Sequence, residues 1–314
     1  MGIDGGANKT VGVLLDVNGR LLASHRAAGC AIKGRPGAEA LALLAAVGED
    51  LCAQAGVGGD AACFCGIGLN GVDFDDEMPM QRRAIAGALR LPEDRLALVN
   101  DGIAALWGAT PAPAAAIIQH GSGITTAWRA RWGGETPFDN LDAGRIYDIR
   151  WEVMAVVARM IDGRVAPTPL KDRVLAHLNL SAEKFAEAVF RRTYDRQRYL
   201  STPRLIFEAY EQGDAGAELL VGRAIDDYAQ TAAAMVRRTG RDDADVALGG
   251  GTVQPAGPKF WKRLAERIAA AAPKAKVIRP QLEPEYGAAI MAAFAAGQDA
   301  AAFYEKALAA RAAG

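Results

Sequence analysis

The feature that most restricts the fold is a series of short apolar strands alternating with helices, and this series occurs twice along the chain. Each half opens with a strand–turn–strand unit, at residues 3–26 in the first half and at residues 114–132 in the second. The pair Asn18-Gly19 predicts the hairpin turn of the first unit, because both residues tolerate a positive φ. Strand–helix alternation in both halves predicts an α/β fold with two sheets.

Further elements follow from apolar runs bounded by turn residues. Residues 149–238 are expected to be mostly helical, and Pro111 and Pro113 break the chain at an expected domain boundary. The other expected strands are residues 61–68, 96–100, 246–248 and 276–279. The other expected helices are residues 37–55, 76–89, 102–109, 260–272 and 287–296.

Length and charge exclude several classes of protein. A chain of 314 residues is long enough for about two domains. Its 36 Lys and Arg residues balance 37 Asp and Glu residues, so it is not a generally basic nucleic-acid binder. No apolar run approaches the length of a membrane span, and no secretory signal is visible at the N-terminus.

Cysteine and histidine usage gives no sign of a disulfide scaffold or a zinc hydrolase. The four cysteines, Cys30, Cys52, Cys63 and Cys65, are interpreted as structural thiols, since free cysteine is among the most buried residue types. Only three histidines are present, and there is no His-Glu-x-x-His motif.

The first candidate site is the loop from Asp4 to Thr10, where a strand runs into small residues that let backbone amides approach an anion. Asp4, at the strand end, suits a Mg²⁺ ion. The loop is not a Walker A motif, because Asn8 stands where that motif needs glycine and no helix follows. A plain hairpin turn, with Lys9 solvated, is the alternative interpretation.

The second candidate site is Asp101, which stands between an expected strand and the first turn of an expected helix. As a catalyst it would accept a proton from an alcohol that attacks a phosphoryl group. The alternative is a helix N-cap, a role that would explain the residue without any chemistry.

Glycines follow strands at two further places, residues 121–123 and residues 249–251. A third glycine cluster, at residues 66–71, matches the spacing of a dinucleotide-binding motif. We discount that match, because no helix opens at its last glycine as a dinucleotide site requires.

Taken in order, these sites resemble the sugar kinase/Hsp70/actin superfamily, and most of all its N-acetylglucosamine kinase branch, grouped with the BadF/BadG-type ATPases. Residues 4–10 match the first phosphate motif, Asp101 and the following small residues match the catalytic motif, and residues 121–124 match the second phosphate motif. Residues 248–251 match the adenosine motif, and residues 284–290 match a closing Pro-x-x-Gly-Ala-Ala helix.

The resemblance implies a two-lobed actin-like ATPase fold, in which ribonuclease H-like domains flank an ATP cleft. Residues 1–110 would form the smaller lobe, joined by a C-terminal helix at residues 300–314, and residues 111–299 the larger lobe with the adenosine site. It also implies a cytoplasmic protein, since ATP is required, and it allows a homodimer. The Fe–S activator branch is not expected, because no cysteine lies in residues 110–160.

The resemblance further implies an ATP- and Mg²⁺-dependent kinase that phosphorylates N-acetylglucosamine or a related amino sugar at its 6-hydroxyl, with Asp101 as general base. Asp4 and Asp101 would hold the metal. The nucleotide would be bound by Asp4, Gly5, Gly6, Ala7, Asn8, Lys9, Thr10, Gly121, Ser122, Gly123, Gly249, Gly250 and Gly251. The sugar would be bound by Asn70, Asp101, Ser122, Asn140 and Asp148.

This chain departs from the family pattern mainly on the sugar side. The family's Gly-Asp-Glu-Gly-Ser is present only as residues 147–151, where Asp142 competes with Asp148 for the acid, and Ile32 stands close to the place of a sugar-binding Asn. Smaller changes put Ala7 and Asn8 in the first loop and Ile124 after the second.

These departures keep two other classes open, a nucleotide-binding regulatory ATPase without sugar transfer and an inactive structural homologue. Purely structural roles are also open for three candidate sugar-binding residues: Asn70 as a turn former, and Asn140 and Asp148 as surface loop residues. Trp107 and Trp151 are interpreted as core residues rather than as stacking platforms for a sugar.

Overall fold

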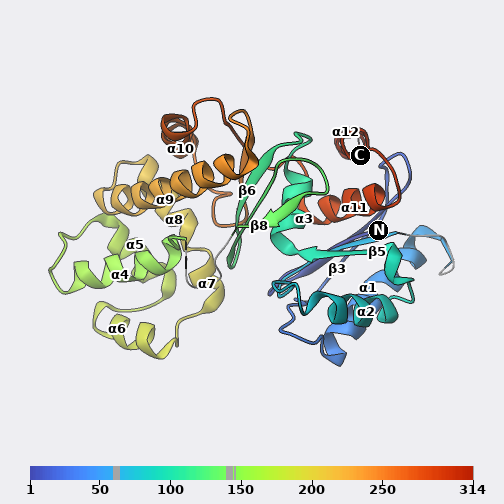
Figure 1. The fold of residues 1–314 in the computed structure, drawn as a ribbon. Helices are drawn as coiled ribbons and strands as arrows, with labels where there is room; N and C mark the ends of the chain where they lie inside the picture. Colours follow the sequence, from blue (N-terminus) through green and yellow to red (C-terminus); the bar gives the residue numbers. More distant parts are fainter. Residues whose placement is uncertain (59–63, 139–143, 145, 314) are drawn as a thin grey trace.

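The computed structural model describes residues 1–58, 64–138, 144 and 146–313. Two five-stranded sheets form the framework, one in each lobe (Figure 1). The predicted α/β fold with two sheets is confirmed.

The first sheet has the order β3-β2-β1-β4-β5, in which β1 is antiparallel to β2 and parallel to β4, and β4 is parallel to β5. Its strands are β1 (Gly2–Gly5), β2 (Thr10–Leu15), β3 (Leu21–Ala27), β4 (Cys65–Leu69) and β5 (Leu96–Asn100). One face packs on α1 (Ala38–Ala55) and α2 (Met78–Ala88), and the other on α3 (Asp101–Ala109) and α11 (Pro284–Ala295).

The second sheet repeats this topology with the order β10-β9-β6-β7-β8. Its strands are β6 (Ala115–His120), β7 (Ile124–Arg129), β8 (Glu135–Pro137), β9 (Asp245–Gly249) and β10 (Lys276–Ile278), of which β8 was not predicted from the apolar pattern. The predicted helical region contains α4 (Ile149–Ile161), α5 (Pro169–Leu178), α6 (Ala182–Arg191), α7 (Arg196–Leu200), α8 (Thr202–Glu211) and α9 (Ala215–Thr239). The helix α10 (Pro258–Ala271) packs against α9.

The residues of β6 alternate between the two faces of the second sheet, as expected for a strand buried on both sides. Ala115 and Ile117 join the core cluster that contains α3, whereas Ala116 and Ile118 join the cluster built by the helices of the second lobe. Figure 1 shows β6 and α3 between the two lobes. The helix α3 therefore contacts both sheets, and whatever stands at its first turn lies at the lobe interface.

Glycines let α11 approach the first sheet closely. An added Cβ at Gly2 or Gly66 would lie 2.2 Å or 1.9 Å from a backbone oxygen of α11, and one at Gly68 would meet α3. Helix packing therefore explains Gly66 and Gly68 of the apparent dinucleotide motif, whereas Gly71, with a φ of +96°, lies against the Ile32 carbonyl of a loop.

The final helix, α12 (Ala300–Ala313), packs on α11 and β3. In it, Tyr304 donates a hydrogen bond to the Gly108 carbonyl at 3.0 Å. The predicted domain limits stay a prediction, although α11, which lies within the predicted larger lobe, packs on the first sheet.

The two singled-out tryptophans have different environments. Trp107 is buried, and its ring lies 4.6 Å from that of Trp132, so its interpretation as a core residue is confirmed. The same interpretation is wrong for Trp151, which is 45% exposed. In α4, the buried stripe runs through Ile149, Val153 and Val157, and Trp151 lies off it.

Cys30 and Cys65 are buried and Cys52 is half-buried, while Cys63 lies outside the described residues. No helix in the described part of the chain is long and apolar enough to cross a membrane.

Candidate active site

Three predicted site residues stand at the carboxyl ends of neighbouring parallel strands. Asp4 lies near the end of β1, Asn70 directly follows β4, and Asp101 directly follows β5. The register pairs Asp4 with Gly68 and Leu69 with Asn100, so these strand ends meet at one edge of the sheet. This edge is where ligands bind in open α/β sheets.

Asp101 does not cap its helix. The cap of α3 is the preceding residue, Asn100, whose Oδ1 accepts a hydrogen bond from the Gly102 N–H at 2.8 Å. The alternative of a capping role for Asp101 is therefore wrong. Asn70 lies near enough to Asp101 to lower the pKa of its carboxyl, but Asp101 Oδ1 is buried and has no hydrogen-bond partner among the described residues. Asp101 Oδ1 is thus an acceptor at the lobe interface that can bind a group from outside the protein.

Burial, together with repulsion from neighbouring acids, makes Asp4 and Asp101 hard to ionise. Burial, followed by the charges of Asp101 and Glu285, raises the pKa of Asp4 to about 7, although Lys9 opposes the shift. Burial also raises the pKa of Asp101, and the charge of Asp73 adds to the rise, although Asn70 opposes it. The site consequently favours a cation that would stabilise both carboxylates in their charged form.

A third acid in this region, Glu285, was missed by the sequence analysis. It lies in the first turn of α11 and is 8% exposed, and its Oε2 has no partner among the described residues. Burial raises the pKa of Glu285, and the charge of Lys9 lowers it. Acids are common in the first turn of a helix because they interact favourably with the helix dipole. The position of Glu285 in the sequence therefore gave no sign that its side chain is buried.

The donor set suits Mg²⁺ better than a metal held only by protein. Among the described residues no group of three His, Cys, Asp or Glu is arranged to hold a metal ion. Mg²⁺ usually keeps several waters and binds through one or two carboxylates together with substrate phosphates. Asp4 and Asp101, which interact electrostatically, fit that mode of binding.

The first glycine loop is a tight hairpin between β1 and β2. The Gly6 N–H donates to the Lys9 carbonyl, and the Cys30 N–H donates to the Gly6 carbonyl, both at 3.0 Å. Asn8 and Lys9 are exposed, and the Asn8 side chain accepts a hydrogen bond from Arg196 of α7 in the other lobe at 3.4 Å. Thr10 is buried, and its hydroxyl has no partner in the described part of the chain.

The two glycine loops of the second sheet lie against each other. The Thr252 N–H donates to the His120 carbonyl and the Thr252 hydroxyl to the Gly121 carbonyl, both at 3.0 Å. Gly250 has a φ of +94°, and an added Cβ there would lie 2.3 Å from the His120 oxygen. This close approach requires glycine at position 250.

One polar contact joins the two lobes beside Asp101. The Thr125 hydroxyl, two residues after Gly123, donates to Asn100 Oδ1 at 3.1 Å. The structure therefore brings the second phosphate loop close to the predicted general base.

Asp148 is fully engaged within the protein. Its Oδ1 caps α4 by accepting from the Arg150 N–H at 3.0 Å, and both oxygens accept from the Arg150 guanidinium. Burial alone would raise the pKa of Asp148, but hydrogen bonds and positive charge from His120 and Arg150 hold it well below its usual range. It lies next to the second phosphate loop, since Arg150 also contacts Ser122. Asn140 lies outside the described residues.

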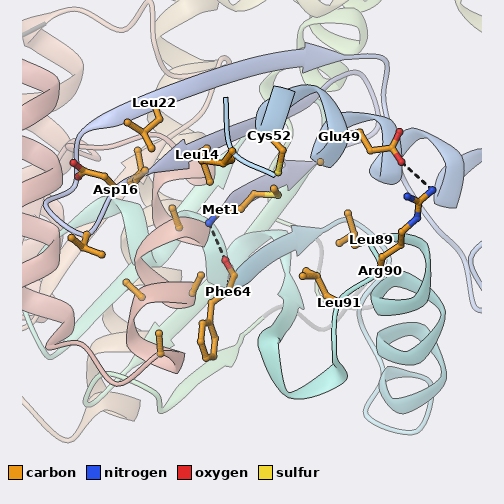
Figure 2. Close-up of a pocket in the computed structure, with 18 of the residues that line it drawn as sticks. Met1, Leu14, Asp16, Leu22, Glu49, Cys52, Phe64, Leu89, Arg90 and Leu91 are labelled. Carbon is orange, nitrogen blue, oxygen red and sulfur yellow. Dashed lines mark hydrogen bonds and ion pairs between the residues drawn. The ribbon is translucent and has the colours of Figure 1, made fainter. Parts of the chain in front are cut away.

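A separate apolar cavity of about 360 Å³ lies in the first lobe, away from these carboxylates (Figure 2). Its lining includes Met1, Leu14, Leu22, Leu89 and Leu91. None of the predicted site residues is among the described residues that line it, so it is not the candidate active site.

Comparison with known proteins identifies the family of this chain and supports its fold. The model of the BadF/BadG/BcrA/BcrD ATPase family matches residues 1–292. A search of curated proteins gives no match.

Among solved structures, a Chromobacterium violaceum protein assigned as an N-acetylglucosamine kinase has a TM-score of 0.66 and 22% identity, over 93% of this chain and 97% of its own. The ROK hexokinase from Thermus thermophilus has a TM-score of 0.60 and 19% identity, over 94% and 98%. A ROK-family transcriptional regulator, a homologue of the Escherichia coli MLC protein, has a TM-score of 0.63 and 13% identity, over 98% and 80%. These similarities confirm the expected actin-like fold.

Proposed function

We propose that this chain, which belongs to the BadF/BadG/BcrA/BcrD ATPase family as its ordered motifs predict, is an ATP-dependent sugar kinase. The observation that carries the proposal is Asp101. Its carboxylate directly follows β5, is not used as a helix cap, and keeps a buried oxygen with no partner among the described residues. A carboxylate held this way suits proton transfer from a hydroxyl group.

ATP would lie between the glycine loops of the two lobes. Its adenosine would rest at residues 249–251, and its phosphates between residues 5–10 and residues 121–123. Asp4 and Asp101 would hold Mg²⁺, which when bound neutralises charge on the phosphates. Support comes from the shared repulsion of these carboxylates, which a cation relieves.

In the transfer step, Asp101 orients the attacking hydroxyl and takes its proton. The hydroxyl oxygen forms a bond to the γ-phosphorus while the bond from that phosphorus to ADP breaks. The buried Oδ1 of Asp101, which has no hydrogen-bond partner among the described residues, is the atom that would take the proton. Positioning of both reactants accounts for most of the remaining acceleration.

For the acceptor we propose N-acetylglucosamine or a related amino sugar, phosphorylated at its 6-hydroxyl. The assignment of the Chromobacterium violaceum neighbour supports this choice. Asn70, which contacts Asp101, and Ser122 would bind the sugar, and Asn140 and Asp148 stay predicted sugar residues. A reaction that consumes ATP also favours the cytoplasm, and a homodimer stays a prediction.

The test is an ADP-release assay with Mg-ATP against N-acetylglucosamine, glucosamine, N-acetylmuramic acid and glucose. We expect saturable release with at least one amino sugar, and its loss in Asp101→Asn. Release that no sugar raises above the background of the variant, while ATP still binds, would contradict the kinase proposal for these sugars.

One observation favours a second candidate, a nucleotide-dependent regulatory ATPase without sugar transfer. Both oxygens of Asp148, the predicted sugar acid, are already bound to Arg150. ATP-dependent binding of a partner protein without sugar turnover would decide for this candidate. Failure to bind Mg-ATP at millimolar concentration would instead indicate an inactive homologue.

A further inference from the structure

Arg150 is a buried charged residue to which the site described above gives no role. It is the second residue of α4 and is 2% exposed. Its side chain reaches the loop that follows β6, where Nη1 donates to the Gly121 carbonyl at 2.7 Å and Nη2 donates to the Ser122 carbonyl at 3.1 Å. One guanidinium thus binds two successive carbonyls of the second phosphate loop.

The surroundings of Arg150 hold its guanidinium in place. Asp148 accepts from Nε at 2.9 Å and from Nη2 at 3.0 Å, a forked pairing that only arginine can make. His120 Nε2 lies 3.4 Å from Nη2, and His120 Nδ1 is hydrogen-bonded to the Tyr228 hydroxyl. Burying an ion pair costs free energy that an apolar side chain at this position would avoid.

The carbonyls that Arg150 binds also fix the direction of the neighbouring N–H groups. In a planar trans peptide the carbonyl and the N–H of the next residue point in opposite directions. Because the Gly121 and Ser122 carbonyls point toward Arg150, the N–H groups of Ser122 and Gly123 point away from it. The hydrogen bonds of the described residues include none from either N–H group. Two adjacent unpaired amides of this kind form an anion-binding concavity.

We infer that Arg150 is a positioning residue, which orients the Ser122 and Gly123 amides toward the phosphates of the nucleotide by holding the Gly121 and Ser122 carbonyls. The inference rests on the proposed nucleotide site and does not depend on the identity of the acceptor. Thr252, whose hydroxyl also binds the Gly121 carbonyl, holds the same loop from the neighbouring turn.

The experiment measures binding without sugar, using calorimetry with the magnesium complex of a non-hydrolysable ATP analogue and, separately, with adenosine. Arg150→Met removes all the donors, and Arg150→Lys keeps the charge without the fork. We expect the Kd of the ATP analogue to rise about tenfold or more in Arg150→Met and by less in Arg150→Lys. The Kd of adenosine should change less than about twofold, because adenosine carries no phosphate.

Arg129→Lys is the matched control, since Arg129 is also a buried arginine that binds backbone carbonyls, at Thr110 and Ala112, but does not contact the loop. Its substitution should lower thermal stability and leave both Kd values unchanged. The inference is overturned if Arg150→Lys folds and binds the ATP analogue as the wild type does, or if adenosine binding falls by the same factor. Wild-type protein that binds neither ligand would contradict the proposed function itself.

Discussion

The two lobes differ in whether the polar groups at their interface are paired. In the first lobe, the half-buried Asp4 and Asp101 and the buried Glu285 are acids with raised pKa values. In the second lobe, the carbonyls of Gly121 and Ser122 are bound by Arg150, and Asp148 is paired. The first lobe therefore carries electrostatic strain that a bound cation would relieve, whereas the second presents an already ordered backbone. Repulsion in the first lobe favours a bound cation, whereas the second lobe holds its backbone preorganised.

The strongest test of the comparison is Asp101→Asn, which removes the proposed proton acceptor of the first lobe and keeps the shape of the side chain. We expect kcat for phosphoryl transfer to fall about 10²- to 10⁴-fold, the usual contribution of a general base. The Kd of Mg-ATP should change less than about threefold, since the glycine loops are untouched. Steady-state kinetics with calorimetric titration would measure both, and turnover above about a tenth of the wild-type value would exclude this role.

The next test uses pH to reveal the electrostatic strain in the first lobe. The pKa of Asp4 is about 7 in the folded protein, above the ordinary value of 3.8 that it has when unfolded. The folded state therefore binds more protons between those values, and the free energy of unfolding of the ligand-free protein should fall as pH rises from about 4 to 7. The limit for one such group is about 1.4 kcal/mol per pH unit.

Asp4→Asn should weaken this pH dependence and raise the free energy of unfolding at pH 8 by about 1–3 kcal/mol, while abolishing transfer. At pH 4 the substitution should have little effect, because Asp4 is then protonated in the folded protein. Chemical denaturation at both pH values would measure the change, with the exposed Asp75→Asn as control. Equal effects of the two substitutions at pH 8 would argue against strain at Asp4.

A smaller effect is expected from Glu285→Gln. Burial raises the pKa of Glu285, but Lys9 and Arg311 oppose the shift, so less repulsion remains to be removed. We expect a gain in the free energy of unfolding of about 1 kcal/mol at pH 8. The pKa of Asp4, followed by NMR of its carboxyl carbon, should fall because a neighbouring negative charge is gone. An unchanged pKa would show that Glu285 is not part of the acid cluster.

Local signals in the sequence predicted the framework well. Residues 96–100 were expected as a strand and form β5, and the helix expected from residue 102 begins one residue earlier. That single residue matters, because Asn100 and Asp101 are both good N-cap residues and only the structure shows which one caps. The roles of Glu285 and Arg150 could not be predicted from the sequence. The burial of Glu285 depends on the docking of α11 against the first sheet, and that of Arg150 on its contact with the loop at residues 121–122. Asn140 lies outside the described residues, so its prediction is untested.

The last prediction concerns Asn100, which caps α3 in place of Asp101. Asn100 caps α3 through Oδ1, which also accepts from Thr125 of the other lobe. Asn100→Ala should lower the free energy of unfolding by about 1 kcal/mol, the usual cost of a lost N-cap. Asn100→Ser can still cap and should recover most of that loss. Because the cap orients the first turn of α3, and Asp101 with it, kcat should fall more in Asn100→Ala than in Asn100→Ser. Equal kcat values in the two variants would mean that the strand end, rather than the cap, positions Asp101.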